Sequence, residues 1–234
     1  MNLNELASAC HLYNTKTNFD SSYLYFLKVT DNSLDLNKAK HRKAMLVWLN
    51  SWKCRQFIIA YHDFASAQIH KWYINLNYLL PEKSKNIWEL SGNDFDKIKI
   101  LYDTLSNTQV AKKIKNKKEV INHAGPTGAS KILFALRPKS LMLWDGKMRD
   151  DLGKGDDSLA YIEYLQKAKQ DIEILIKHCK LNGFTLQELP EKINRSYSTI
   201  PKILDEYRWV TVTKGWQVPK LNKFITCAQN NMEV

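Results

Sequence analysis

The chain has 234 residues, 44% of them hydrophobic, which is enough to bury a core in one large domain or in two small lobes. With only 8 Gly and 6 Pro, long helices are expected rather than many short strands and turns. The sequence shows neither an N-terminal apolar segment of the secretory type nor a run of 18 apolar residues, so we expect a cytoplasmic protein without a membrane partner.

The four cysteines are scattered along the chain and form no C-x-x-C pair. This pattern argues against a local zinc site and against a closely spaced iron–sulfur cluster. We therefore expect reduced thiols, no metal and no cofactor. The cysteines are Cys10, Cys54, Cys179 and Cys227.

The first part of the chain predicts an irregular start followed by three helices. Residues 1–33 carry only one apolar run and are expected to be loosely packed. Apolar periodicity then predicts helices over about 34–53 and 56–80, the second ending at Pro81, and an acid-first helix from Asp94 to Leu105.

The middle of the chain is built around a Gly-Pro-Thr-Gly turn at Gly125–Gly128. Glycines at the start of a helix leave backbone N–H groups accessible, and such a helix start suits phosphate binding. The elements predicted around the turn are an amphipathic piece at 108–114, a lead-in at 117–121, a helix at 129–136, an extended segment at 140–144 and a short helix at 146–152.

The last part of the chain predicts one long helix and several short elements. Asp157 and its neighbours cap a helix that runs to about Asn182, where Gly183 ends it. Two short helices follow at 185–194 and 198–207, and residues 209–213 alternate as a strand would. The predicted fold is mostly α, with helical lobes at 34–107 and 108–182, a C-terminal segment at 183–234 that packs back, and a short C-terminal strand.

Most of the excess positive charge lies around the Gly-Pro-Thr-Gly turn. The formal net charge is +11, and residues 108–154 hold eleven Lys or Arg against four acids. A cluster of this kind is typical of proteins that bind a polyanion. The alternative is a solvated, lysine-rich helical face.

One aspartate stands between an apolar run and this basic region. Asp145 follows Trp144 directly and precedes Gly146. A carboxylate delivered by a hydrophobic segment can be sheltered from water and aimed at a reacting centre. The alternative role is to cap the helix that begins at Gly146.

These two features together resemble the helix-hairpin-helix DNA glycosylase superfamily, which includes endonuclease III, adenine glycosylase and 8-oxoguanine glycosylase. The resemblance covers about 30 residues: the Gly125–Gly128 turn, Lys131 after it, and the sequence Asp145-Gly146-Lys147-Met148-Arg149. It implies a two-lobed helical bundle with a helix-hairpin-helix element, which binds duplex DNA as a monomer and flips one nucleotide out of the stack.

The resemblance also assigns roles to residues. Asp145 would stabilise the sugar cation as the base leaves, and Lys131 is the candidate nucleophile. Because the interval from Lys131 to Asp145 is shorter than in the family, we expect a monofunctional enzyme in which Lys131 contacts phosphate or positions the substrate. The expected DNA contacts are Gly125, Thr127, Gly128, Ser130, Lys139, Lys147 and Arg149.

The base pocket would lie between the lobes, next to Asp145. Trp144 would wall it, with packing in the core as the alternative, and His62 would be a polar pocket residue. The opposite wall is expected to come from Trp48, Trp52, Tyr61 and Trp72.

Two classes of function follow from the sequence. The first is a DNA N-glycosylase that removes a damaged or modified base, in repair or in defence against phage. The second is a non-catalytic nucleic-acid-binding protein that retains the same scaffold. A third, a helical toxin or defence factor that binds RNA, rests on the basic face alone.

Overall fold

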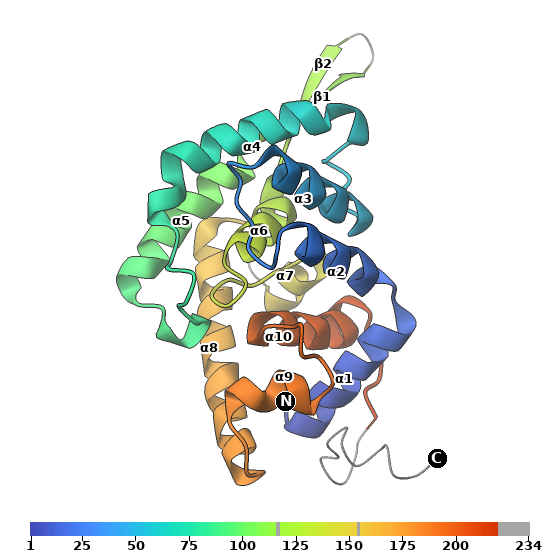
Figure 1. The fold of residues 1–234 in the computed structure, drawn as a ribbon, viewed down its shortest axis with the longest axis vertical. Helices are drawn as coiled ribbons and strands as arrows, with labels where there is room; N and C mark the ends of the chain where they lie inside the picture. Colours follow the sequence, from blue (N-terminus) through green and yellow to red (C-terminus); the bar gives the residue numbers. More distant parts are fainter. Residues whose placement is uncertain (116–117, 154, 220–234) are drawn as a thin grey trace.

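The computed structural model describes residues 1–115, 118–153 and 155–219. This part of the chain contains ten α-helices and one two-stranded sheet, so the prediction of a mostly α fold is confirmed (Figure 1). Within these residues, no helix combines the length and the apolar composition that crossing a membrane requires.

The N-terminal segment is helical, and the prediction that it would be irregular is wrong. It forms α1 (Leu3–Lys16) and α2 (Phe19–Val29). A capping box stabilises the start of α1, because the Asn2 side chain accepts a hydrogen bond from the Glu5 N–H and the Glu5 side chain accepts one from the Asn2 N–H. Both helices bury aromatic residues.

The three helices predicted next are present, with shorter bounds for the first two. They are α3 (Ala39–Ser51), α4 (His62–Leu76) and α5 (Gly92–Ser106). Residues 52–61 form a loop between α3 and α4, which includes Lys53 in a left-handed conformation with φ of 61°. Helix α4 therefore begins later than predicted.

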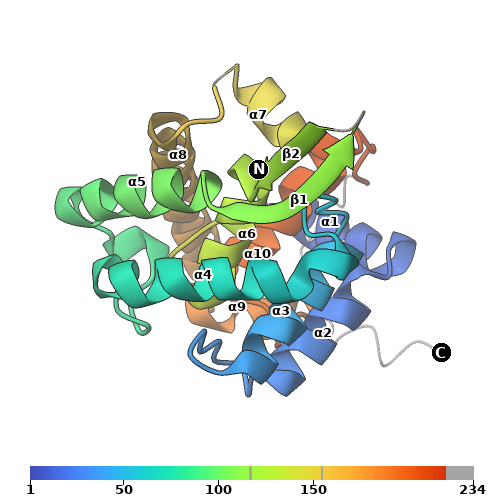
Figure 2. The ribbon, with the colours of Figure 1, turned by 90° about the horizontal axis from the view of Figure 1, so that it is seen from above.

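The segment before the Gly-Pro-Thr-Gly turn is a β-hairpin. Strands β1 (Gln109–Lys115) and β2 (Lys118–His123) pair antiparallel, and the hairpin projects from the top of the helical body (Figure 1). β1 packs against α4 (Figure 2). Both strands contain β-branched residues, which favour extended structure. A strand thus stands where the resemblance implied a helix, and the helix-hairpin-helix element is not confirmed.

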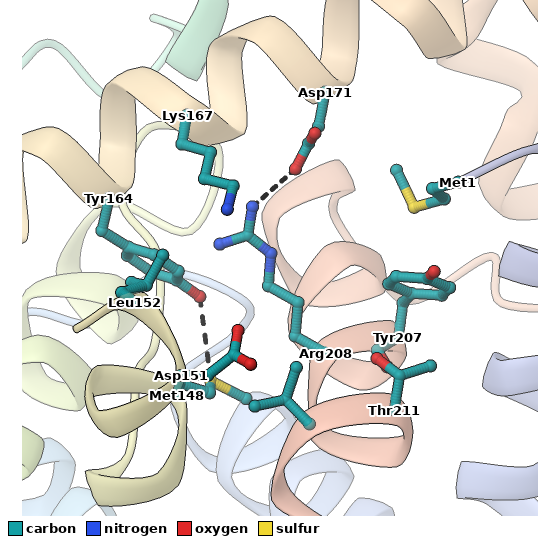
Figure 3. Close-up of a pocket in the computed structure, with 11 residues that line it drawn as sticks. Met1, Met148, Asp151, Leu152, Tyr164, Lys167, Asp171, Tyr207, Arg208 and Thr211 are labelled. Carbon is teal, nitrogen blue, oxygen red and sulfur yellow. Dashed lines mark hydrogen bonds and ion pairs between the residues drawn. The ribbon is translucent and has the colours of Figure 1, made fainter. Parts of the chain in front are cut away.

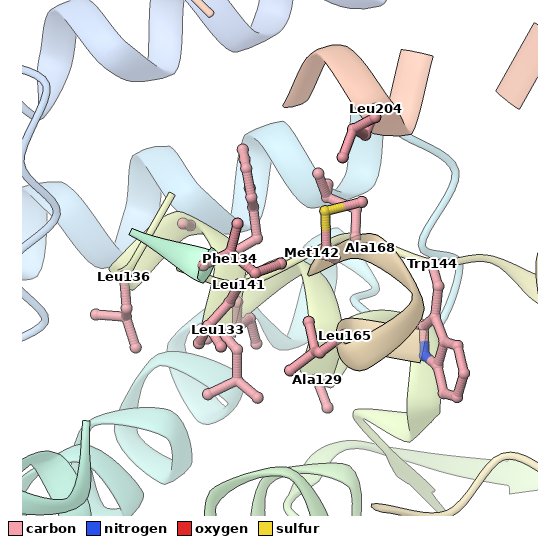
Figure 4. Packing of buried hydrophobic residues seen from close by; sticks show 14 of the residues in the cluster. Ala129, Leu133, Phe134, Leu136, Leu141, Met142, Trp144, Leu165, Ala168 and Leu204 are labelled. Carbon is pink, nitrogen blue, oxygen red and sulfur yellow. The ribbon is translucent and has the colours of Figure 1, made fainter. Parts of the chain in front are cut away.

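Helix α6 (Gly125–Leu136) lies at the centre of the molecule (Figure 1). Its residues from Gly128 to Leu136 are all buried, and it contacts α3 and α5. Figure 4 shows this packing, with Leu133 and Phe134 close to the segment that carries Met142. One cluster of buried residues extends from Leu3 to Leu204, so the described helices share a core.

The remaining helices follow the predicted order. They are α7 (Gly146–Leu152), α8 (Ser158–Leu181), α9 (Leu189–Lys192) and α10 (Ile200–Arg208). Helix α10 packs against α1, which brings the two ends of the described chain together (Figure 1). Short 3₁₀ turns occur at Ile59–Tyr61, Asn77–Leu79, Ile87–Glu89 and Leu186–Glu188.

The predicted C-terminal strand is wrong. Residues Trp209–Thr213 form a π-helical turn that continues α10, and the Lys214 N–H donates to the Trp209 carbonyl at 3.0 Å. The alternating pattern of this segment favours a strand, but tertiary packing overrides it. Trp209 lies edge-on to Tyr13 of α1 and Phe19 of α2. π-helical turns of this type are often found at functional sites.

Candidate functional site

A pocket of about 270 Å³ lies where α1, α6, α10 and the segment before α7 converge. This is slightly below the roughly 300 Å³ at which pockets for drug-sized ligands begin. The pocket therefore suits one small ring system rather than a whole nucleotide. It is lined by aromatic side chains and by charged groups of both signs.

Aromatic rings form the walls. Phe19 lies between Trp52 and Trp209, with ring centroids 5.8 Å and 5.7 Å away. Tyr13 and Trp144 also line the pocket. Trp144 is 1% exposed and donates its indole N–H to the Tyr102 hydroxyl, so it packs in the core and forms a wall at once. Such walls favour a planar ligand because aromatic rings stack on one another.

Asp145 lines the pocket and is held by two hydrogen bonds. Its Oδ1 atom accepts from the Met148 N–H at 3.0 Å, and its Oδ2 atom accepts from the Thr213 hydroxyl at 2.8 Å. The first bond caps α7, so the capping role weighed from the sequence is confirmed. The second ties the carboxylate to the π-helical turn after α10.

Lys131 lines the same pocket from the second turn of α6. Its ammonium donates to the Trp52 carbonyl at 3.1 Å and lies 5.3 Å from the centroid of the Trp52 ring. Thr127 is four residues earlier, on the same face of the helix, and also lines the pocket. The structure thus brings Lys131, Thr127 and Asp145 together.

A second carboxyl group, Asp205 of α10, also lines the pocket and is 5% exposed. Burial raises the pKa of the Asp205 carboxyl to about 7, although the nearby charge of Lys202 opposes the shift. Lys202 is fully buried, pairs with Glu206 at 2.8 Å and lies 4.4 Å from the centroid of the Tyr13 ring.

Cationic side chains surround the mouth of the pocket. Lys53 lies over the Phe19 ring and Lys214 over the Trp209 ring, and both are exposed. Arg149 donates to the Thr127 hydroxyl at 3.0 Å, which connects α7 to the start of α6. The rim therefore favours an anionic partner.

No protein-family model, curated protein or solved structure matches this chain. The chemistry of the site therefore rests on its own geometry. Among the residues that the structure describes, no group of three or more His, Cys, Asp or Glu could hold a metal ion.

The two glycines of the Gly-Pro-Thr-Gly turn are each required by the structure, for different reasons. Gly125 has φ of +65°, a left-handed conformation that favours glycine. A Cβ atom on Gly128 would lie 2.8 Å from Gln56 Nε2 and 2.9 Å from Phe57 Cε2, so the loop after α3 requires a glycine there. Ser130 is fully buried and donates to the Thr127 and Trp144 carbonyls, so its hydroxyl is not accessible to a strand.

The lysines expected to contact DNA lie in different places. Lys147 is exposed on α7, close in sequence to Asp145. Lys139 follows the C-terminus of α6, a helix of 12 residues that is about 18 Å long. Lys139 is therefore at the opposite end of α6 from the turn at Gly125 and does not belong to the same surface.

Two residues expected in the base pocket do not line it. Trp48 is 1% exposed and stacks on Phe26 with ring centroids 5.0 Å apart, so it belongs to the core. His62 begins α4 and is not among the lining residues. Tyr61 and Trp72 are also elsewhere, whereas Trp52 lines the pocket as expected.

Sequence reasoning missed Asp205 and Trp209, which both line the pocket. They are four residues apart and share a face only if the helix continues through Trp209. The alternation of residues 209–213 concealed this relation, because it predicted a strand. Lys53 and Lys214 carried no local signal of their own.

A second pocket, of about 260 Å³, is lined by residues of α7, α8, α10 and the turn after α10 (Figure 3). Arg208 donates there to Asp171 at 2.5 Å and lies over the Tyr164 ring. The Arg208 cation is paired with Asp171 there, whereas Lys167, which also lines this pocket, is exposed.

Proposed function

We propose that the chain is a DNA N-glycosylase, which takes one modified base into the pocket and cleaves its N-glycosidic bond. The observation that carries this proposal is the convergence of Asp145, Lys131 and aromatic walls in one pocket with a cationic rim. The resemblance of the Gly125–Gly128 turn and the Asp145 motif to helix-hairpin-helix glycosylases supports the same chemistry.

Each part of the pocket has a role in this reaction. Trp52, Trp209 and Phe19 stack on the flipped base, because unstacking a base from DNA must be offset by new contacts. The Asp145 carboxylate stabilises the positive charge that develops on the sugar as the base leaves. Water then adds to C1′ and its proton passes to the released base, which completes a monofunctional reaction.

Lys131 acts as a positioning residue in this scheme. Its ammonium is engaged by the Trp52 carbonyl and ring, which holds it at the edge of the pocket. From there it orients the substrate or its phosphate. Lys53 and Lys214 at the mouth bind the flanking phosphates.

The test uses Asp145→Asn. Asparagine is as good an N-cap as aspartate, so α7 stays capped while the charge is removed. We expect a loss of base release of about 10²- to 10³-fold on duplexes that carry a panel of modified bases, with DNA affinity retained. Abasic sites are detected as alkali-labile breaks, and breaks formed without alkali would make Lys131 a nucleophile.

The matched control is Asp157→Asn, which changes the N-cap of α8 in the same way and lies outside the pocket. It should release base as the wild type does. Equal base release by the Asp145→Asn variant and the wild type would reject the proposal.

A non-catalytic nucleic-acid-binding protein is the second candidate. The observation that favours it is that both Asp145 oxygens accept structural hydrogen bonds, one from α7 and one from Thr213. Salt-sensitive DNA binding without release of any base from the panel would select this function.

A further inference from the structure

Asp205 differs from Asp145, the other carboxyl group of the pocket, because no described residue donates a hydrogen bond to it. The side chain is 5% exposed and lines the pocket. Asp145, in contrast, accepts hydrogen bonds from both the Met148 N–H and the Thr213 hydroxyl. Burial of a carboxyl without donors raises its pKa, because desolvation penalises the charged form.

The ionisable groups that face Asp205 carry both signs. They are Lys202 and Glu206 of α10, Lys131 of α6, Asp145 before α7, Tyr13 of α1, Tyr23 of α2 and Tyr164 of α8. Lys202 is the strongest of them, but its ammonium already pairs with Glu206 at 2.8 Å. Burial raises the pKa of Asp205 by more than the nearby lysines lower it, and the resulting pKa is about 7.

We propose that Asp205 is protonated when the pocket is filled, and that its carboxyl group holds the edge of the bound heterocycle. The O–H donates a hydrogen bond to a ring nitrogen or carbonyl oxygen, and the other oxygen accepts one from the neighbouring N–H. The inference rests on the proposed function only in that the heterocycle is a base taken from DNA.

The surroundings of Asp205 define the class of ligand. Aromatic walls from Trp52 and Trp209 select a planar ring, and the pocket volume of about 270 Å³ limits its size. Lys131 and the rim lysines disfavour a positively charged ring. The expected ligand is therefore an uncharged base with a donor beside an acceptor on its edge, rather than a cationic, N-alkylated base.

The experiment measures binding of free bases to the intact chain. Adenine, hypoxanthine, cytosine and uracil are titrated separately between pH 5.5 and 8.5, with quenching of tryptophan fluorescence as the readout. Trp52, Trp144 and Trp209 line the pocket and report on its occupancy. Wild-type affinity for the bases that bind should fall about thirtyfold over this range, because only the protonated fraction binds.

Two variants at the same position make the test specific. Asp205→Asn offers a donor and an acceptor at every pH, so it should bind the same bases with an affinity that is constant across the range. Asp205→Ala should bind them weakly at every pH. Asp150→Asn, which removes an exposed carboxylate of α7, should match the wild type. Thermal unfolding of each variant confirms that it is folded.

Three results would overturn the inference. Wild-type affinity that increases with pH would mean that an ionised carboxylate accepts two hydrogen bonds. Identical, pH-independent binding by the wild type and Asp205→Ala would remove Asp205 from the contact. Absence of quenching by all four bases would reject the pocket as a base site.

This experiment can support the role of Asp205 even if the proposed glycosylase function fails. Bases bound with the expected pH profile, but never released from duplexes, would reject N-glycosidic cleavage and leave the role of Asp205 intact.

Discussion

Asp145 and Asp205 face one pocket but have opposite local environments. Asp145 ends an extended segment, so the free N–H of Met148 at the start of α7 is available to bind its carboxylate. Asp205 lies within α10, where the backbone N–H groups are already used by the helix. The position of each residue in its element therefore decides which carboxyl receives a backbone hydrogen bond.

The pKa of Asp205 predicts a pH-dependent stability. The folded value of about 7 lies above the ordinary value of 3.8, so the native state binds more protons than the unfolded state between these values. The free energy of unfolding should therefore decrease as the pH rises from about 4 to 7, by up to about 4 kcal/mol from this group.

Asp205→Asn lacks this titration and should gain stability relative to the wild type as the pH rises from 5 to 8. Urea unfolding at four pH values measures the difference. A difference that stays constant over the range would show that Asp205 does not titrate as expected.

Gly128 is required by packing, and Gly128→Ala tests this. The added Cβ would lie within 3 Å of Gln56 and Phe57, and the Phe57 ring is buried. We expect a loss of about 1–3 kcal/mol of stability, measured by urea unfolding.

Gly92→Ala is the control for Gly128→Ala, since nothing lies within 4 Å of a Cβ atom at that position. It should change stability by less than about 0.5 kcal/mol or increase it slightly. If Gly128→Ala left the free energy of unfolding unchanged, the loop after α3 would be able to move and accommodate the Cβ atom.

At the scale of elements, the site depends on how helices begin and end. Helix α6 presents Thr127 and Lys131 on one face, α7 begins at the Asp145 cap, and the π-helical turn after α10 supplies Thr213 and Trp209. Asp145 caps α7, and α6 and α7 both contribute residues to the shared core. The pocket exists because these ends meet.

The cap of α8 gives a test at this scale. Asp157 accepts a hydrogen bond from the Ala160 N–H at 2.9 Å, and Asp157→Ala should cost about 1 kcal/mol of stability. Asp156→Ala removes an exposed neighbour without a capping bond and should be neutral. Equal losses in the two variants, measured by thermal unfolding, would contradict the cap assignment.

Several elements follow from the sequence because they are set by local chemistry. The short helix at Gly146–Leu152 and the end of α8 before Gly183 are confirmed, since caps and glycines act within a few residues. The β-hairpin at 109–123 and the π-helical turn at Trp209–Thr213 differ from expectation. Pairing between strands and packing of Trp209 against α1 and α2 are tertiary effects that a local pattern does not contain.

At the scale of the whole molecule, the net charge of +11 predicts strong, salt-dependent binding of DNA. Lys53 and Lys214 at the mouth of the pocket should contribute most directly. A variant with Lys53→Gln and Lys214→Gln should bind duplex DNA more weakly. The slope of log affinity against log salt should decrease in magnitude by about 0.9 for each phosphate that is no longer neutralised.

The matched control removes two exposed lysines at the C-terminal end of α8, as Lys177→Gln and Lys180→Gln. It has the same net charge as the rim variant, so a difference between the two isolates the location of the charge. Fluorescence anisotropy at several salt concentrations measures both. Identical slopes would mean that DNA does not approach the mouth of the pocket.

A buried ion network joins distant parts of the chain. Arg195 pairs with Asp20 of α2 and with Glu206 of α10, and Lys202 pairs with Glu206. No local pattern in the sequence relates Asp20 to Arg195, which is 175 positions away. Lys202 and Glu206 of this network also interact electrostatically with Asp205.

The sequence by itself determined the helical class, the basic character and the Asp145 cap, because each depends on composition or on neighbours a few residues apart. Helix α6 begins at Gly125, within the segment predicted as a turn. Only the tertiary structure decided that Trp52 rather than Trp48 faces the pocket and that Asp205 joins Lys131 and Asp145 there. The reason is physical: burial and pocket geometry depend on contacts between helices far apart in the chain, and the electrostatics of a carboxyl group depend on those contacts.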